Sequence, residues 1–551
     1  MPTRHCVLPP GLARVTREFI VAEGRFAPGH LGELTQVIPF DLVDAVLDET
    51  RCVQRRLRDL PSRVGVYFLL AMCLFPEVGC RLVWHKLTAA LTGVGIEVAE
   101  PTAKALRDLR RRLGAEPMKR VFETLAGPLA QPVTPGVRFG PFRMVSFDGC
   151  TSIKLPDTER NVEWFGPGSR GGYPMLKLMT LVETGTRALI GAVFGTPSDG
   201  ETSYARRLLH HLGPGMLVLW DKGFDANAFL AAVHDTGASF LGRLRANRRT
   251  PVLSRLTDGS YLSVIGTVPV RVVEAQITVA YDDCSFTNSY RLVTTLTDAR
   301  RYPAPALVAL YHQRWEHESA YFALRHTITD GRVLRSGDPV GVEQEMWALL
   351  ALYQALRTVM VEAAESRPGT DPDRCGFTIA IQTARDLVVQ AADVIKPGAL
   401  GNRPTGVIGN RVLAGLLPHR RPRISTRKVR SPVSRYAERQ DDGRPDISRL
   451  VTDLDVTILE PDPDLPTVSH DDRHTPAADR RRQRVLDLLH AEPDRQWHTR
   501  DLARHLGDIT LGTMYRQLDR WAVNGLIAKT GPATYSSPRT RSTLLPPAEI
   551  R

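Results

Sequence analysis

Two short apolar segments of this chain end in the same way, with an aspartate that is followed closely by a glycine. The segment "MVSFDG" places Asp148 directly before Gly149, and "LVLWDKGF" places Asp221 two residues before Gly223. Each segment has the length and the Val, Leu and aromatic content of a buried strand. A single aspartate in such a position usually begins a turn. Two similar strand ends in one region are less readily explained by chance.

The residues around these two segments predict a mixed α/β region. Short segments rich in Val, Ile, Leu and Phe predict an antiparallel meander at 142–149, 174–183 and 187–195. Further strands, each after a helical segment, are predicted at 215–220 and 239–245. The pattern then becomes strand-like without a helical period, which predicts a β-rich insertion over 246–297.

A third acidic residue stands in the segment "YHQRWEHESAYFALRHT" (311–327), which is predicted to be helical. Its residues Tyr311, Arg314, Glu318 and Arg325 follow one another at intervals of three, four and seven. At about 3.6 residues per turn these positions face roughly the same way. Such a stripe is usually a half-solvated helix face with a surface ion pair. The alternative depends on whether Glu318 meets further carboxylates.

Asp148, Asp221 and Glu318 together would form an oxygen-rich site for Mg²⁺ or Mn²⁺. Two such ions can activate a water or a 3′-hydroxyl and stabilise the leaving oxygen of a phosphoryl transfer. Arg314 and Arg325 lie about one and two turns from Glu318, and they could grip the phosphates beside the scissile bond. The sequence therefore predicts that the three carboxylates are both catalytic residues and metal ligands.

Over about residues 30–435, these motifs resemble those of the insertion-sequence-four family of DDE transposases. The segment "FDGCTSIKLPDTERNVEWFG" is similar to the first aspartate block of the family, although Cys150 separates its glycine from Thr151. "LWDKGFD" resembles the second block. The predicted helix resembles the signature Y-x2-R-x3-E-x6-K, with Arg325 in place of the lysine.

The resemblance implies an α/β fold with an RNase H-like catalytic core that the β-rich insertion interrupts. It also implies excision and integration of the element's own DNA with a divalent metal, and DNA contacts by the signature residues Tyr311, Arg314 and Arg325. The partners would be double-stranded DNA, as terminal inverted repeats and as target, and a second copy of the chain in a homodimer. Some members cut through a DNA hairpin with the help of a tryptophan in the insertion. Residues 246–297 contain no tryptophan, so the sequence leaves that step open.

The overall composition agrees with an acidic polymer as the partner. The formal net charge is +12 and the pI is about 9.5, and arginine, whose planar fork suits phosphate, supplies most of the positive charge. The seven cysteines are scattered without a C-x-x-C pair, so neither a zinc knuckle nor a disulfide framework is indicated. No signal peptide is recognisable, and the most apolar stretch, 64–75, is too short to span a bilayer. We therefore expect a cytoplasmic, bacterial-type protein associated with the nucleoid.

Several domains are expected along the chain. Residues 1–135 predict a helical DNA-binding domain. Its basic run is either a solvated face or a contact to DNA backbones, and it consists of Arg107, Arg110, Arg111, Arg112, Lys119 and Arg120. The remaining segments follow in order: the catalytic core in two parts (136–245 and 298–395) around the β-rich insertion (246–297), a basic segment (396–436), an acidic, proline-rich linker (437–478) and a winged helix-turn-helix (479–551).

The C-terminal block begins a new pattern at Arg480. Helix, short strand, helix, turn, longer helix and hairpin follow one another, an order that fits a winged helix-turn-helix. Arg516 and Gln517 lie on the outer side of the proposed recognition helix, where they could contact DNA bases. The alternative is a helical protein-interaction module.

The sequence thus predicts a DNA transposase with sequence-specific end binding. A nuclease on the same fold, which cuts strands without joining them, is the nearest alternative. A DNA-binding regulator with an inactive core is another. The full signature helix and the β-rich insertion favour the transposase over the nuclease, and the three intact carboxylates speak against the regulator.

Overall fold

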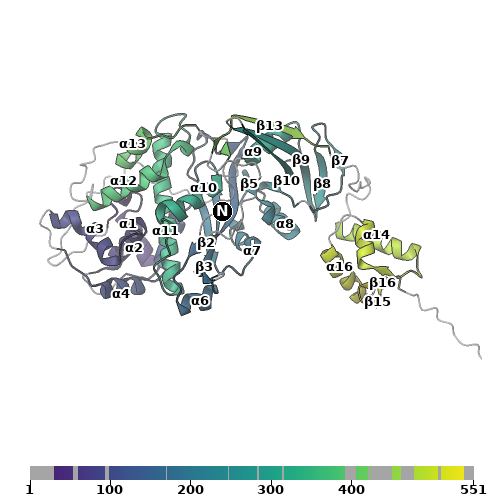
Figure 1. Cartoon of the computed structure of the whole chain (residues 1–551), viewed down its shortest axis with the longest axis horizontal. Helices are drawn as coiled ribbons and strands as arrows, with labels where there is room; N and C mark the ends of the chain where they lie inside the picture. Colours follow the sequence, from purple (N-terminus) through teal and green to yellow (C-terminus); the bar gives the residue numbers. More distant parts are fainter. Residues whose placement is uncertain are drawn as a thin grey trace, which may run out of the picture. The chain divides into compact units, whose positions relative to one another are not determined.

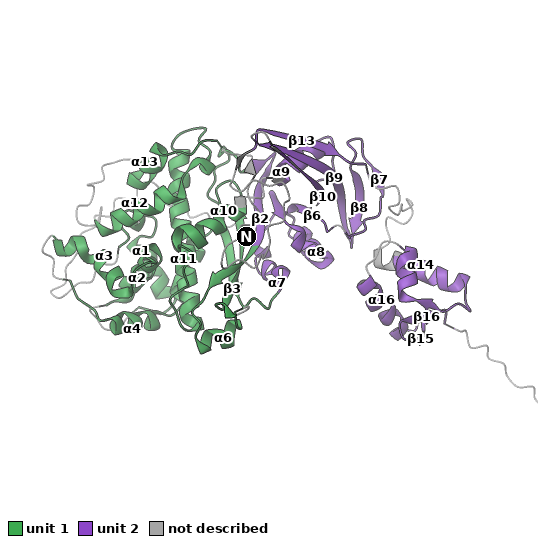
Figure 2. Ribbon diagram, viewed as in Figure 1, with its two compact units in different colours: residues 1–137, 149–199, 316–419 green, residues 138–148, 200–315, 420–551 purple. Residues whose placement is uncertain are grey.

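A computed structural model of the chain describes residues 30–53, 60–93, 98–168, 171–245, 247–281, 284–312, 316–390, 405–419, 423–424, 449–460, 477–506 and 511–538. The chain divides into two compact units, which Figure 2 shows in different colours. Unit 1 consists of residues 1–137, 149–199 and 316–419, and unit 2 consists of residues 138–148, 200–315 and 420–551.

Unit 1 is built mainly from helices (Figure 1). In chain order these are η1 (Leu34–Gln36), α1 (Phe40–Glu49), α2 (Ser62–Leu74), α3 (Cys80–Gly93), α4 (Ala103–Leu113), α5 (Glu116–Leu125), α6 (Glu159–Phe165), α10 (Glu316–Phe322), the π-helix η6 (Ala323–Ile328), α11 (Pro339–Glu365), η7 (Pro372–Arg374), α12 (Phe377–Val389) and α13 (Gly406–Ala414). The boundaries follow local rules. The long helix α11 begins with Asp338 as its cap and Pro339 in its first turn, and α4 ends at Gly114, which has a φ of +67°.

Helix α11 forms the centre of the core of unit 1. Its residues are buried on nearly all sides, which suits a helix that is apolar all round. It contacts α2, α5, α12 and α13, and the apolar side chains of these helices form one continuous core. Helices α1–α5 share this core with helices from the end of the catalytic region. A separate domain over residues 1–135 stays a prediction.

The strands of unit 1 include a hairpin. β3 (Met175–Glu183) and β4 (Ala188–Gly195) pair in antiparallel register after the second part of β2 (Phe142–Lys154). Leu176, Leu178 and Val182 of β3 belong to the same core as the helices. One face of this hairpin is therefore covered by the helical layer of unit 1.

Unit 2 contains β1 (Arg138–Phe139), the first part of β2, and the strands β5 (Met216–Trp220), β6 (Ser239–Arg243), β7 (Ser254–Arg255), β8 (Tyr261–Ile265), β9 (Val268–Tyr281) and β10 (Cys284–Thr294). Its helices are α7 (Glu201–Arg206), η3 (Leu209–His211), η4 (Lys222–Phe224), α8 (Asn227–Asp235) and α9 (Ala304–His312). The strand order is β4-β3-β2-β5-β6-β10-β9-β8-β7. β5 pairs in parallel with β2 and β6, whereas β10 pairs with β6 in antiparallel register. The strands of the expected insertion therefore continue the core sheet.

A further strand comes from the region that the composition predicts to be a linker. Residues Asp453–Ile458 form β13, which pairs in antiparallel register with residues 275–280 of β9. Leu454, Val456 and Ile458 pack against the core of unit 2, and the intervening side chains are exposed. The expectation of a continuous linker over 437–478 is therefore wrong for this stretch, because its apolar residues alternate with the period of two of a half-buried strand.

The C-terminal part of the chain has a small core of its own. Its elements are α14 (Ala477–Ala491), β14 (Trp497–His498), α15 (Thr499–Leu506), α16 (Leu511–Val523), β15 (Ala528–Gly531) and β16 (Thr534–Ser536), and the strands form a sheet in the order β14-β16-β15. Buried side chains from all three helices and from the sheet form a separate apolar cluster: Val485, Leu489, Trp497, Leu502, Leu506, Met514, Leu518, Trp521, Ile527 and Tyr535. This order of elements agrees with the sequence prediction.

Among the helices that the structure describes, none has both the length and the apolar character needed to cross a bilayer. The longest, α11, belongs instead to the core of unit 1.

Candidate active site

Asp148 and Asp221 occupy equivalent positions on adjacent parallel strands of unit 2. The last registered pair between β2 and β5 is Ser146 with Leu219, and each aspartate follows its member of that pair by two residues. Asp221 still has an extended backbone, with φ −81° and ψ 171°. Because side chains alternate between the faces of a strand and adjacent strands lie about 4.8 Å apart, the two carboxylates reach the same face of the sheet side by side.

The residue before each aspartate buries a large aromatic ring in the opposite face. The ring of Phe147 lies 6.3 Å from that of Phe224, and the ring of Trp220 lies 5.0 Å from that of Phe240. Phe229 of α8 contacts both Phe147 and Trp220, at 6.1 and 5.6 Å. Turning either aspartate toward this side would expose its aromatic neighbour to water, so the pairs F-D and W-D of the two motifs fix the direction of the carboxylates.

Helix α9 covers the face to which the aspartates point. Its residues Leu307, Val308 and Leu310 share a core with side chains of that face of β2 and β5. Tyr311 is buried, and its hydroxyl donates a hydrogen bond to the backbone oxygen of Trp220 at 3.1 Å. The helix that leads to the glutamate is thus anchored beside Asp221. The expected contact of Tyr311 with DNA stays a prediction, and this burial does not support it.

Glu318 belongs to α10 of unit 1, and its side chain is exposed. Arg314 lies outside the described residues. Within the described ranges no group of three His, Cys, Asp or Glu residues is close enough to hold a metal ion together. The structure therefore brings together two of the three predicted ligands, and two carboxylates on one face suit a cation that prefers oxygen ligands.

Arg325 lies in the π-helix η6 and donates two hydrogen bonds within unit 1. One of its terminal nitrogens, Nη1, donates to Ser152 Oγ at 2.6 Å, and its Nε donates to the backbone oxygen of Tyr321 at 3.3 Å. Ser152 stands four residues after Asp148 on β2. Burial lowers the pKa of the neighbouring His326, and the positive charges of Arg325 and Lys154 lower it further. Arg325 thus fastens the end of the signature segment to the strand that carries the first aspartate.

Comparisons with known proteins agree with this arrangement. Residues 28–123 match the family described as insertion element 4 transposase N-terminal, and residues 146–354 match the transposase DDE domain. The transposase InsG for insertion sequence element IS4 of Escherichia coli (strain K12) is 28% identical over 415 residues, which is 72% of this chain and 91% of that protein. The chain belongs to the insertion-sequence-four family of DDE transposases.

It is therefore a DNA transposase, an enzyme that cleaves and transfers DNA strands, and the DDE domain implies the use of a divalent metal. The putative transposase InsZ of Escherichia coli (strain K12) is 22% identical over 173 residues, which is 30% of this chain and 57% of that protein. Among solved structures, the piggyBac transposase synaptic complex with hairpin DNA matches with a TM-score of 0.34 and 12% identity, over 73% of this chain and 84% of that one.

The structure places Arg243, which belongs to none of the sequence motifs, next to Asp221. Trp220 of β5 pairs with Gly242 of β6, so Arg243 is the neighbour of Asp221 in the next parallel strand. Gly242 leaves room for the indole of Trp220, because a Cβ atom would collide with it. The guanidinium of Arg243 lies 4.9 Å from the ring centre of Tyr290 and donates to the backbone oxygen of Ser289 at 3.0 Å. The position of Arg243 beside Asp221 follows from the register of β5 and β6, and no motif spacing in the sequence indicates it.

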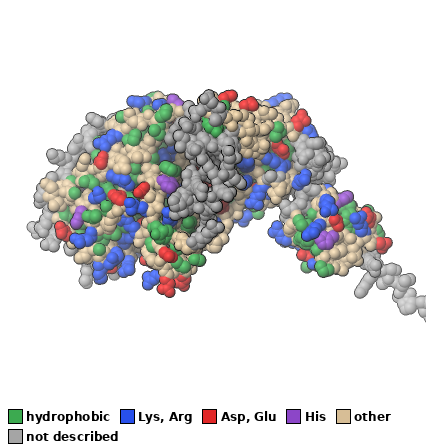
Figure 3. All heavy atoms as spheres, viewed as in Figure 1, with side chains coloured by type: hydrophobic (Ala, Val, Ile, Leu, Met, Phe, Trp, Pro, Cys, Tyr) green, Lys and Arg blue, Asp and Glu red, His purple; other side chains and the backbone are tan. Residues whose placement is uncertain are grey.

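The arginines of the basic run on α4 differ in their surroundings. Arg107, Arg111 and Arg112 of α4 are exposed, and the face drawn in Figure 3 shows Lys and Arg side chains gathered at its lower left, over α4. Arg110 instead donates to the side chains of Gln344 and Ser336, at 3.2 and 2.7 Å. Arg110 therefore joins α4 to α11, whereas the side chains of Arg107, Arg111 and Arg112 are exposed.

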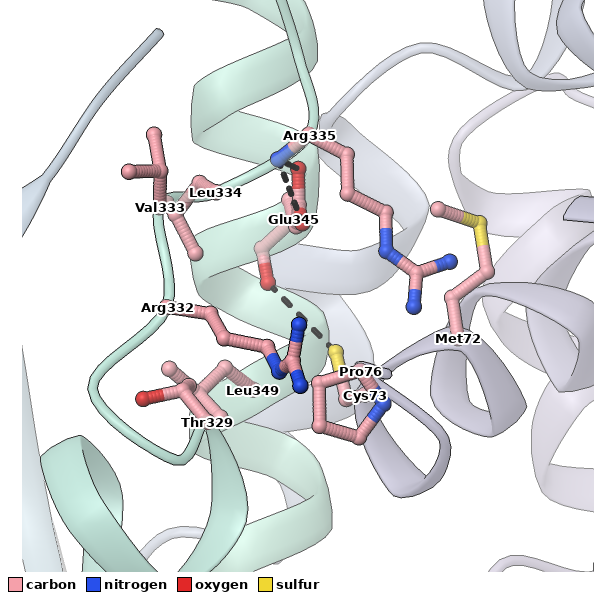
Figure 4. Close-up of a pocket in the computed structure, with 10 residues that line it drawn as sticks. All are labelled: Met72, Cys73, Pro76, Thr329, Arg332, Val333, Leu334, Arg335, Glu345 and Leu349. Carbon is pink, nitrogen blue, oxygen red and sulfur yellow. Dashed lines mark hydrogen bonds between the residues drawn. The ribbon is translucent and has the colours of Figure 1, made fainter. Parts of the chain in front are cut away.

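A small pocket in unit 1 carries no catalytic group (Figure 4). The carboxylate of Glu345 accepts hydrogen bonds from the backbone nitrogens of Arg335 and Ser336, at 3.0 to 3.2 Å. Burial raises the pKa of the Cys73 thiol, which keeps the sulfur protonated. Glu345 thus serves as a hydrogen-bond acceptor for the backbone, and the Cys73 thiol is unreactive.

In the C-terminal part, α16 presents Arg516 to solvent. Gln517 is half-buried, and its side-chain oxygen accepts a hydrogen bond from Arg481 of α14 at 3.4 Å. Of the two residues expected to contact bases, Arg516 is thus the more accessible.

Proposed function

We propose that Asp148, Asp221 and Glu318 are the catalytic carboxylates of this transposase and that they hold Mg²⁺, or Mn²⁺ in its place. The observation that carries the proposal is the register of the parallel strands β2 and β5, in which Asp148 and Asp221 each lie two residues beyond the last registered pair, Ser146 with Leu219. Glu318 adds an exposed carboxylate from the helix that follows α9 in the chain. The strand order β4-β3-β2-β5-β6, with β2, β5 and β6 parallel, supports an RNase H-like catalytic core.

Asp148, Asp221 and Glu318 would hold the metal ions, which would supply activation of the attacking oxygen and stabilisation of the leaving oxygen of a phosphoryl transfer. The protein's own residues orient the reactants. The aromatic cluster behind Asp148 and Asp221 keeps both carboxylates on the reacting face, and Tyr311 holds α9 against it. Arg243 supplies a positive charge beside Asp221 for a phosphate of the DNA strand.

The variants Asp148→Asn, Asp221→Asn and Glu318→Gln test the proposal. Each should reduce nicking of a plasmid that carries the element ends to background, because a neutral amide binds Mg²⁺ far more weakly than a carboxylate. Gel-shift affinity for the ends should remain, since end binding depends mainly on phosphate contacts. Nicking by the unaltered protein should require Mg²⁺ or Mn²⁺, and Ca²⁺ should support it poorly, because calcium adopts larger and looser coordination.

Asp235→Asn is a matched control, because Asp235 is an exposed aspartate at the end of α8 in the same unit. It should nick at the rate of the unaltered protein. Normal nicking by one of the three carboxylate variants would remove that residue from the proposed triad, and full activity in excess chelator would exclude the metal mechanism.

We also propose that the C-terminal part is a winged helix-turn-helix that binds duplex DNA. The order of its helices, its three-stranded sheet and the exposure of Arg516 on α16 support this assignment. Terminal inverted repeats and target DNA would be the substrates, a homodimer would pair two ends, and the protein would act in the cytoplasm at the nucleoid. Membership of the transposase family favours strand joining over cleavage alone.

A further inference from the structure

The face of β3 that packs on the helices of unit 1 carries one polar side chain among apolar ones. Side chains on this face come from Leu176, Leu178, Thr180 and Val182, since every second residue of a strand shares a face. The three aliphatic residues belong to the core of unit 1. Thr180 is completely buried between them. Its hydroxyl therefore needs partners within the protein.

Both partners of Thr180 come from α10, the helix of Glu318. Thr180 Oγ1 lies 2.8 Å from Nε2 of His317, and it donates to the hydroxyl of Tyr321 at 3.0 Å. His317 is completely buried and Tyr321 is 4% exposed. Since Thr180 has one proton and gives it to Tyr321, Nε2 of His317 must carry the hydrogen of the other bond. His317 and Tyr321 are four residues apart, so they share one face of the helix.

We propose that Thr180, His317 and Tyr321 form a polar clamp that sets the rotation of α10 and thereby the direction of the Glu318 carboxylate. All three are positioning residues, because none is placed to touch the DNA. Glu318 directly follows His317, so when His317 faces β3 the side chain of Glu318 is turned about 100° around the helix axis. The observed exposure of Glu318 agrees with this setting. The inference rests on the proposed catalytic role of Glu318.

Apolar packing alone would not fix this rotation. Ala320, Ala323 and Leu324 also pack in this core and are small or flexible apolar residues, and the hydrogen bond of Arg325 to Ser152 holds the segment at η6 and not at α10. Apolar contacts are non-directional, and they tolerate a small rotation or shift of a short helix. The buried polar trio favours one setting, because a rotation of the helix would break the two hydrogen bonds that join Thr180 to it.

The Mg²⁺ dependence of nicking by the full-length protein tests the clamp. Thr180→Val removes the hydroxyl with little change of shape, and Tyr321→Phe removes the second hydroxyl. Each should raise the Mg²⁺ concentration for half-maximal nicking on the order of tenfold, as is usual when a residue that orients a metal ligand is lost. Thr180→Ser keeps the hydroxyl and should retain a Mg²⁺ dependence close to that of the unaltered protein. End binding in a gel shift should be unchanged in all three.

Thr88→Val is the matched control for a general loss of stability. Thr88 of α3 is buried in the same unit and donates a side-chain hydrogen bond to Trp84 at 3.0 Å. This variant should lower the melting temperature as Thr180→Val does, without a change in Mg²⁺ dependence. If Thr180→Val and Tyr321→Phe also keep the normal Mg²⁺ dependence, the trio merely stabilises the fold and the inference is overturned.

A failure of the clamp can be told apart from a failure of the proposed function. Normal nicking by Glu318→Gln would mean that Glu318 is not catalytic, and both ideas would fall together. An inactive Glu318→Gln combined with an unaltered Mg²⁺ dependence of Thr180→Val would leave the catalytic role of Glu318 intact and remove the clamp alone.

Discussion

Three consecutive residues at the end of β5 have very different surroundings. Trp220 is completely buried, Asp221 is half-buried and Lys222 is exposed. The indole holds the strand end in the aromatic layer, and the next residue then has to face the opposite side. The same alternation operates at Phe147 and Asp148 on β2. At the residue scale, the direction of each carboxylate is thus determined by the apolar side chain before it.

Arg243 provides a prediction at this scale. Arg243→Ala should weaken binding to element ends and reduce the log–log salt slope of binding by about one, because one phosphate contact is lost. Arg243→Lys should keep most of the slope but lose part of the affinity, since an ammonium is a point charge without the planar fork. Fluorescence anisotropy over a range of salt concentrations measures both quantities.

Arg255→Ala serves as the comparison for Arg243, because Arg255 is an exposed arginine on β7 of the same unit. It removes an equal charge away from Asp221. An equal change of slope in both variants would mean that only the net charge matters, and the assignment of Arg243 to the site would then be incorrect.

Strand β13 shows how an element from the end of the chain completes the sheet of unit 2. One edge of β9 pairs with β8 up to Val272, and β13 pairs with residues 275–280 of β9. An unpaired stretch of edge would offer free N–H and C=O groups to other chains. By covering it, β13 also adds apolar contacts to the core that includes α9.

Substitutions on the two faces of β13 test its contribution to stability. Val456→Asp places a charge against the apolar core and should lower the free energy of unfolding by about 2 kcal/mol. Thr457→Asp introduces the same charge on the exposed face of the same strand, and it should change that free energy by less than about 0.5 kcal/mol. Chemical denaturation of the full-length protein measures both values, and equal losses would show that β13 does not pack as described.

The sequence predicted these elements well where the signal is local, and poorly where it depends on a distant partner. Asp221 follows the end of β5 as its motif predicts, because the motif contains its own strand, whereas Asp148 lies within β2, which continues to Lys154. The alternation in "DLDVTI" was present, but its partner β9 lies far earlier in the chain, and the acidic composition suggested a linker instead. His317 was missed for the same reason, since Thr180 is 137 residues away. Pairing and register, which follow from tertiary packing, decide such cases.

At the scale of the whole molecule, each of the two units is assembled from three separate segments of the chain. Unit 1 draws on residues before, within and after the catalytic motifs, and unit 2 includes the C-terminal part. The core of that part, from Val485 to Tyr535, contains only its own residues. A segment with an apolar core and a sheet of its own is expected to fold by itself.

The last prediction therefore concerns the C-terminal part as an independent DNA-binding module. A fragment of residues 477–538 should fold and bind duplex DNA with strong salt dependence, and Arg516→Ala should weaken its binding at preferred sites by about 1–3 kcal/mol. Arg495→Ala is the control, because Arg495 lies outside α16 and pairs with Glu492. Circular dichroism verifies folding, and anisotropy at two salt concentrations measures binding. A folded fragment that binds no duplex even at low salt would identify the module as a protein-interaction domain, and the chain without it should then nick element ends with unchanged efficiency.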